Sequence, residues 1–164
     1  MMQVPHFKNV TFIETKPERA RSILEDTIQS LTCSLCILSI STPAKTIRSG
    51  QRTNVTIIDC TGQNTQESDS NTIFIKNASS LAEMSAAISA WLEKTQGERY
   101  FILDSLPTLA MYNPPSYVAR FAHTVATKTR LSQAGCVFLS AKESISQELR
   151  AEIVQICDAI IQDD

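Results

Sequence analysis

Residues 100–140 read YFILDSLPTLAMYNPPSYVARFAHTVATKTRLSQAGCVFLS, and this stretch decides the fold. It begins with a strongly apolar strand pattern at residues 100–104 and ends with a second one at residues 135–140. Between them lies a helical pattern whose apolar stripe is Val118, Phe121, Ala122 and Val125. Two strands joined by a helix predict a right-handed βαβ crossover, and therefore a parallel sheet.

The same alternation extends outward in both directions. Apolar strand patterns recur at residues 10–14, 33–39, 55–60, 72–76 and 159–162. Capping-box patterns at Thr15–Glu18 and Ser80–Glu83 predict the starts of two helices, and further helices are expected after Pro43, from residues 112–115 and over residues 146–157. The prediction is one α/β domain over residues 1–164, with a mostly parallel central sheet and helices on both faces. Residues 61–71 are polar, and we expect a mobile surface loop there.

Composition excludes several classes of protein. The 164 residues carry 15 Lys and Arg against 17 Asp and Glu, so there is no basic excess for bulk binding of nucleic acid. No apolar run reaches the ~18–20 residues of a membrane span, and the N-terminus has no signal-peptide pattern, so we expect a cytoplasmic protein without a membrane partner. The four glycines are widely scattered, which excludes a standard glycine-rich phosphate loop.

Five cysteines include one close pair, Cys33 and Cys36. A redox or zinc role for this pair stands against a structural one. A structural zinc site needs four ligands, and the sequence offers no second pair at metal-binding spacing. Both residues fall in a predicted strand, where positions i and i+3 point to opposite faces. The pattern favours small buried hydrophobic residues.

Residues 101–144, together with IIDCTGQ, NASSLAEMSAAISAWLEK and ICDAIIQ, resemble the KaiC-like branch of the RecA-type ATPases in order and spacing. The resemblance spans residues 10–162 and implies a three-layer RecA-like fold. It also implies that Asp104 and the adjacent Ser105 occupy the Walker-B position, which orders nucleotide-bound magnesium in that family. If no cation binds, we expect Asp104 to find partners in the amides of residues 105–106 or the hydroxyls of Ser39 or Ser140.

The first strand should be followed by the phosphate-binding loop G-x-x-x-x-G-K-[ST]. The nearest frame is TKPERARS at residues 15–22, in which Thr15 and Ala20 replace the glycines and Arg21 replaces the lysine. Ser22 alone fits the pattern. Thr and Ala do not readily supply the positive φ angles and close backbone approach of a phosphate nest. Thr15 is instead expected to cap a helix that starts directly after the strand, which makes this nucleotide site vestigial.

The catalytic glutamate of the family would lie near residues 39–45, SISTPAK, which contain no carboxylate. The expected function is therefore a non-catalytic regulatory or protein-interaction module without a cofactor. The resemblance implies further copies of the chain, or an active KaiC-like ATPase subunit, as partners, and a place among archaeal KaiC-like signalling proteins. The alternative is a weak nucleotide-binding protein or ATPase that uses Arg21, Ser22 and Asp104 in a remodelled site. Sensing of a small molecule at the carboxyl ends of the strands also stays open.

Overall fold

The computed structural model describes residues 8–47, 52–63 and 71–164. Its strands are β1 (Val10–Thr15), β2 (Ser34–Ser39), β3 (Val55–Asp59), β4 (Thr72–Phe74), β5 (Arg99–Asp104), β6 (Gly135–Ala141) and β7 (Ala159–Asp163). Its helices are the 3-10 turn η1 (Pro17–Arg19) and α1 (Ala20–Ser30), α2 (Ala44–Ile47), α3 (Leu81–Lys94), α4 (Leu106–Tyr112), α5 (Pro115–Leu131) and α6 (Gln147–Ile156). Seven of the eleven residues of the expected polar loop, 64–70, lie outside the described residues.

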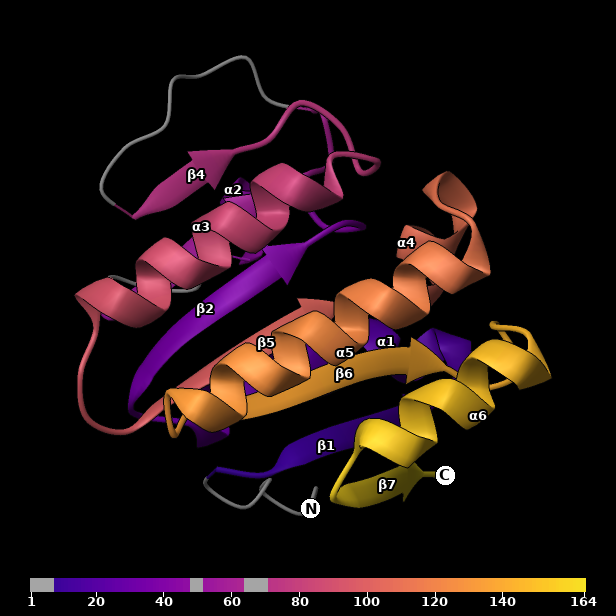
Figure 1. Ribbon diagram of the computed structural model, residues 1–164. Coiled ribbons are helices and arrows are strands. Elements are labelled where there is room, and N and C mark those ends of the chain that lie inside the picture. The colour runs from indigo at the N-terminus through magenta and orange to yellow at the C-terminus, as the bar shows by residue number, and fades with distance from the viewer. Residues whose placement is uncertain (1–7, 48–51, 64–70) are drawn as a thin grey trace.

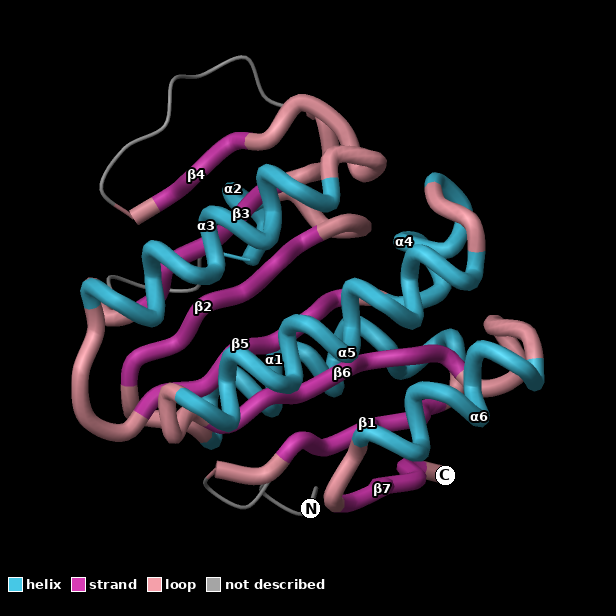
Figure 2. The backbone as a smooth tube through the Cα atoms, viewed as in Figure 1, coloured by secondary structure: helices cyan, strands magenta, loops and turns pink. Residues whose placement is uncertain are grey.

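The strands form one sheet in the order β4-β3-β2-β5-β6-β1-β7, and every pairing is parallel. Helices α3, α5 and α6 cover the face of the sheet that is turned toward the viewer in Figure 1, while α1 and α2 lie behind it. The backbone trace in Figure 2 shows the same three layers. The predicted α/β architecture with helices on both faces is confirmed.

The core is divided in two by the sheet, because successive side chains of a strand point to opposite faces. In β5, Phe101 and Leu103 belong to the cluster packed under α3, α5 and α6. Tyr100 and Ile102 belong to the cluster packed under α1 and α2. A central strand of a parallel sheet is apolar on both sides for this reason, which explains why residues 100–104 carry the clearest strand signal.

Cys33 and Cys36 follow the same division. Cys36 is fully buried in the cluster beneath α3 and α5. Cys33 packs against the opposite cluster. Burial raises the pKa of the Cys36 thiol well above its ordinary value, so it stays protonated. The two thiols lie on opposite faces of the sheet and do not form a paired site.

Two of the predicted helix caps are wrong. Thr15 is the last residue of β1, and its hydroxyl donates to Asp163 on the neighbouring strand β7 at 3.0 Å. Ser80 directly precedes α3, but its hydroxyl donates to the side chain of Asn77 at 3.1 Å. In both cases a tertiary or turn acceptor lies closer than the helix amides. Ser146 does cap α6, where its hydroxyl accepts from the amide of Leu149.

The segment between β5 and the long helix holds a separate element that the sequence reading did not resolve. Leu106–Tyr112 forms α4, and α5 begins only at Pro115. Asn113 lies in extended conformation between them and is buried. Its amide donates to the carbonyls of Ala78 and Leu109 at 2.8 and 3.0 Å, which fixes the bend between the two helices.

Candidate functional site

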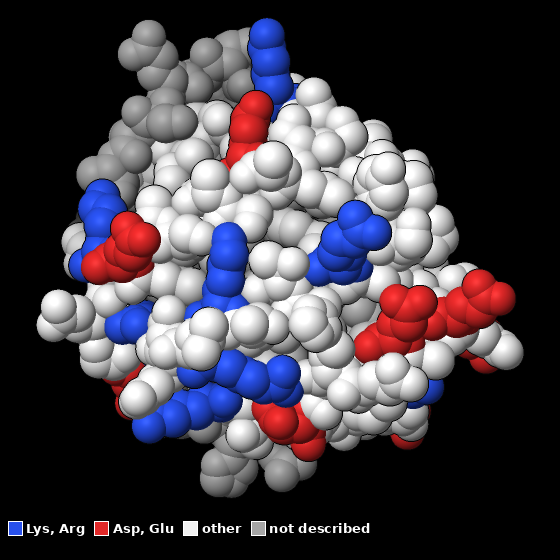
Figure 3. Space-filling model, in the orientation of Figure 1, with Lys and Arg blue, Asp and Glu red and all other residues white. Residues whose placement is uncertain are grey.

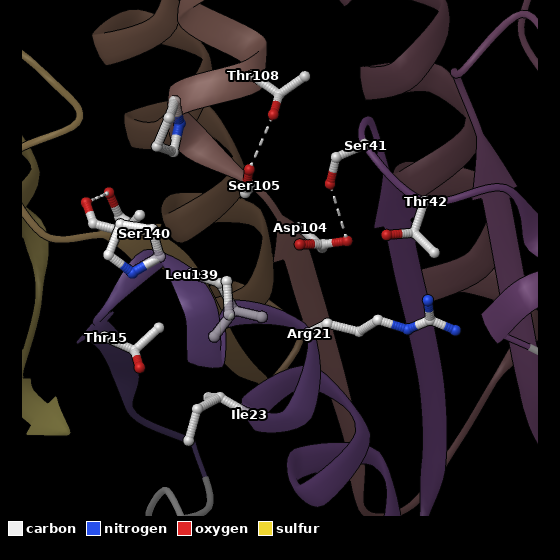
Figure 4. A pocket seen from close by; sticks show the side chains of 14 residues that line it. Thr15, Arg21, Ile23, Ser41, Thr42, Asp104, Ser105, Thr108, Leu139 and Ser140 are labelled. Carbon is white, nitrogen blue, oxygen red and sulfur yellow. Dashed lines mark hydrogen bonds between the residues drawn. The ribbon is translucent and has the colours of Figure 1, made fainter. Parts of the chain in front are cut away.

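A cavity of about 320 Å³ opens at the carboxyl ends of β1, β5 and β6, beside the loop that follows β2. In open parallel sheets this is the edge at which ligands bind. Helix α1 forms one wall and the start of α4 another, as Figure 4 shows. The lining residues are Thr15, Pro17, Ala20, Arg21, Ile23, Ser41, Thr42, Asp104, Ser105, Pro107, Thr108, Leu139, Ser140 and Ala141.

Asp104 lies at the centre of the cavity, at the end of the buried strand β5, and only 6% of its surface is exposed. The hydroxyl of Ser41 donates to one of its carboxylate oxygens at 3.2 Å. Burial raises the pKa of Asp104 to about 6, against the opposing effect of hydrogen bonds from the Ser41 and Thr42 hydroxyls. Its peptide bond to Ser105 is cis.

The partners expected for Asp104 from the sequence were not the right ones. The hydroxyl of Ser39 donates to the carbonyl of Thr42 in the turn after β2. The hydroxyl of Ser140 donates to the carbonyl of Ala141 at 3.0 Å. Both hydroxyls serve a backbone acceptor in their own turn, so Ser41, which follows β2, is the residue that reaches Asp104.

The remaining hydroxyls of the cavity are also engaged. Ser105 and Thr108 share a hydrogen bond of 3.1 Å, drawn in Figure 4, and Thr15 donates to Asp163. A hydroxyl that has donated its proton still offers lone pairs as an acceptor. The wall of the cavity is therefore rich in acceptors.

Arg21 is the one cationic side chain among the described residues that line the cavity. Its Nε pairs with Glu25 one turn further along α1 at 3.2 Å, and two thirds of the Arg21 side chain is exposed. Figure 4 shows its guanidinium on the side of Thr42, away from Ser105 and Thr108. No Lys, Arg or His of the described chain is within ion-pair distance of Asp104.

The structure brings together Thr15, Ala20, Arg21, Asp104 and Ser105 of the six candidate residues. Ser22 is the exception, because it lies outside the cavity wall and its hydroxyl donates to the carbonyl of Arg19 at 2.9 Å. Sequence reasoning missed the further hydroxyl-bearing residues Ser41, Thr42, Thr108 and Ser140. Three of these could have been found by asking what ends or follows each central strand, β2 and β6 included, whereas Thr108 depends on the unpredicted helix α4.

The connection between β1 and the first helix is short. Strand β1 ends at Thr15 and η1 begins at Pro17, so Lys16 alone separates the two elements. No eight-residue loop intervenes, as expected.

The end of β1 is held by its neighbours in the sheet and by α6. Glu14 is buried and accepts two hydrogen bonds from Arg150 of α6, at 2.9 and 2.5 Å. This guanidinium lowers the pKa of Glu14. On β7, Asp163 accepts from Thr15 and pairs with Arg19 at 3.0 Å. The carboxylate of Asp163 therefore sits beside the position that a phosphate loop would occupy.

Other classes of site find no support in the part of the chain that the structure covers. It contains no group of three or more His, Cys, Asp or Glu side chains arranged to hold a metal ion. Nor is any of its helices both long and apolar enough to cross a membrane.

The fold is that of the RecA-like α/β proteins, which it shares with solved ATPase domains. A DnaB-like replicative helicase is 12% identical in sequence and superimposes with a TM-score of 0.54, with 94% of this chain and 46% of that one covered. Two proteins from Pyrococcus horikoshii are similar with higher scores. PH0250 gives a TM-score of 0.67 at 10% identity, with 97% of this chain and 83% of that one covered. PH0321, an uncharacterized protein solved with an unknown peptide, gives 0.68 at 14% identity, with 96% and 78% covered.

The chain belongs to a family of unknown function, DUF7504, which matches it over residues 14–163. No curated protein shows significant sequence similarity to it.

Proposed function

We propose that this chain is a non-catalytic RecA-like domain of the KaiC-like type that serves as a regulatory or protein-interaction module. The observation that carries the proposal is the direct passage from β1 through Lys16 into η1. A phosphate-binding loop needs several residues at this point, whose amides converge on the phosphate. A single linking residue leaves no room for them.

The charges near this connection also disfavour phosphate. The carboxylate of Asp163 is tied to Thr15 and Arg19. Arg21, which stands at the lysine position of the motif, is paired with Glu25 and exposed. A triphosphate at this place would meet an anion where the family motif provides amide donors and a lysine, and the degenerate motif is therefore consistent with a lost nucleotide site.

Catalysis is equally poorly equipped. Among the described residues that line the cavity, Asp104 is the one carboxylate, and there is no histidine, lysine or cysteine beside it. General acid–base chemistry and nucleophilic chemistry both rely on a second group within hydrogen-bond reach of the first. We therefore propose that the chain is not an enzyme and carries no cofactor.

The interaction surface that we propose is the turn between α4 and α5. Met111, Tyr112 and Tyr117 are exposed by 78%, 57% and 54%, which is unusual for large apolar side chains. Figure 3 shows that the surface over α4 and the start of α5 is largely uncharged, whereas charges of both signs are scattered elsewhere on that face. The partner we propose is a second copy or an active KaiC-like ATPase subunit, in a signalling role like that of the archaeal KaiC-like proteins.

One observation favours the second candidate, a weak nucleotide-binding protein or ATPase. Arg21 and Asp104 line the same cavity, and a guanidinium can bind phosphate through two parallel hydrogen bonds. Rotation of Arg21 away from Glu25 would place a cation near the mouth of the cavity.

Thermal unfolding with and without Mg-ATP, together with a phosphate-release assay, separates the two candidates. Binding at a hundred times the Kd would stabilise the protein by roughly 2.7 kcal/mol. We expect no shift beyond that given by magnesium chloride alone, and no hydrolysis above the blank. A shift that Arg21→Gln removes, or hydrolysis that Asp104→Asn removes, would establish the nucleotide-binding alternative instead.

A further inference from the structure

The hydrogen-bonding character of the cavity restricts what can enter it. The protons of the Thr15, Ser41 and Ser140 hydroxyls are already donated to Asp163, Asp104 and the Ala141 carbonyl. Ser105 and Thr108 use one proton between them. Lone pairs on these oxygens remain, so the cavity offers many acceptors and few donors. A ligand that complements it must supply donors.

The charge of the cavity points the same way. Asp104 is 94% buried, since 6% of its surface is exposed, and no cationic side chain of the described residues pairs with it. A buried carboxylate without a counterion is costly, because neither water nor a positive charge stabilises it. A cation delivered by a ligand would provide the missing partner through a charge-assisted hydrogen bond.

We propose that the cavity binds a small organic ammonium compound that also carries hydroxyl groups, with its ammonium on Asp104 and its hydroxyl protons on the surrounding side-chain oxygens. The ammonium has three donors and no acceptor, which suits the acceptors around Asp104. Ile23, Leu139 and Pro107 supply apolar wall for the carbon skeleton.

The size of the cavity limits the ligand. A volume of about 320 Å³ lies at the lower end of the range of ligand pockets, roughly 300–1,000 Å³. An amino alcohol or a single amino sugar fits this range. A compound of this kind would be the signal that a regulatory module reads.

The inference rests on the proposed function only in that the cavity is free of Mg-nucleotide. Amide-detected NMR titration of the full chain tests it with matched probes, since serinol and glycerol differ only in an ammonium in place of a hydroxyl. Ethanolamine and ethylene glycol form a second pair. We expect the amines, and not the neutral partners, to shift the amide signals of Ser41, Asp104 and Ser105.

Variants identify the group responsible. Asp104→Asn should weaken amine binding at least about tenfold, as the loss of a charge-assisted hydrogen bond predicts. Asp104→Ser gives a second test should the asparagine variant fail to fold. Asp26→Asn removes an exposed carboxylate of α1 and should leave binding unchanged. Arg21→Gln should leave amine binding equal or tighter, whereas it would weaken binding of a phosphate.

Each other outcome overturns the inference. It fails if no amine shifts these signals, if glycerol binds as well as serinol, or if the folded Asp104 variants bind amines like the wild type. A parallel titration with Mg-ATP keeps the two proposals distinguishable. Shifts by Mg-ATP at the same amides would overturn the non-nucleotide function, while silence toward both Mg-ATP and amines would overturn the amine site alone.

Discussion

Asp104 is the residue at which stability and function are in conflict. Its carboxylate is buried at the end of β5 with hydroxyl partners but without a cation among the described residues. An arrangement of this kind costs folding free energy in the absence of a ligand. Residues that disfavour folding in this way are frequently found in binding sites.

The pH dependence of unfolding tests this cost. The pKa of Asp104 rises from 3.8 to about 6 on folding, so the folded state holds the proton more tightly. Stability should therefore fall as pH rises from about 4 to about 6, by at most about 3 kcal/mol from this residue. Asp104→Asn removes this penalty. Urea unfolding should find the variant more stable than wild type near pH 8 and about equal near pH 4.

Only the difference between variant and wild type carries this prediction, since Glu14 contributes the opposite sign. The pKa of Glu14 is lowered, so its stabilising contribution is lost as the pH falls. Asp26→Asn serves as the exposed control. A variant that is less stable than wild type near pH 8, or a difference that does not change with pH, would contradict this account of Asp104.

Between elements, the closest approach is that of β5 and β6 at their amino ends. Tyr100 is 2% exposed and lies opposite Gly135 in the register of the two strands. A Cβ atom on Gly135 would lie 2.3 Å from two ring atoms of Tyr100. The glycine is therefore required by the ring that packs over it rather than by the conformation of a turn.

Gly135→Ala should lower the free energy of unfolding by roughly 1–3 kcal/mol, the usual cost of overpacking a core. Chemical denaturation measures this loss. A double-mutant cycle with Tyr100→Leu identifies the cause, because the alanine should cost much less once the ring is absent. Equal costs in both backgrounds would show that the ring is not responsible.

For the whole molecule, the open question is which surface meets a partner. Helix α4 contributes Pro107 and Thr108 to the cavity and ends in the exposed residues Met111 and Tyr112. A partner that docks on this turn would therefore touch the same short helix that borders the cavity. Ligand binding and assembly would then be coupled through α4.

The double variant Met111→Ser/Tyr117→Ser should leave the free energy of unfolding within about 0.5 kcal/mol of wild type, because both side chains are exposed. Sedimentation velocity, with the chain alone and with a KaiC-like ATPase subunit of the same host, should show assembly weakened at least about tenfold. This matches the loss of interface anchors. Leu131→Ser is the control, since Leu131 is 81% exposed at the far end of α5. An equal effect of both variants would exclude the α4–α5 turn as the specific contact.

The sequence by itself determined the class of fold, because a buried parallel strand such as residues 100–104 must be apolar on both faces and the helices between strands must carry one apolar stripe. It also placed Asp104 and Arg21 at strand and helix ends that meet. Only the tertiary structure decided the partners of the polar groups. Thr15 binds Asp163 rather than a helix amide, and Ser41 rather than Ser39 or Ser140 reaches Asp104. The reason is physical: apolar periodicity is a local property, whereas a hydroxyl bonds to whichever acceptor folding brings nearest.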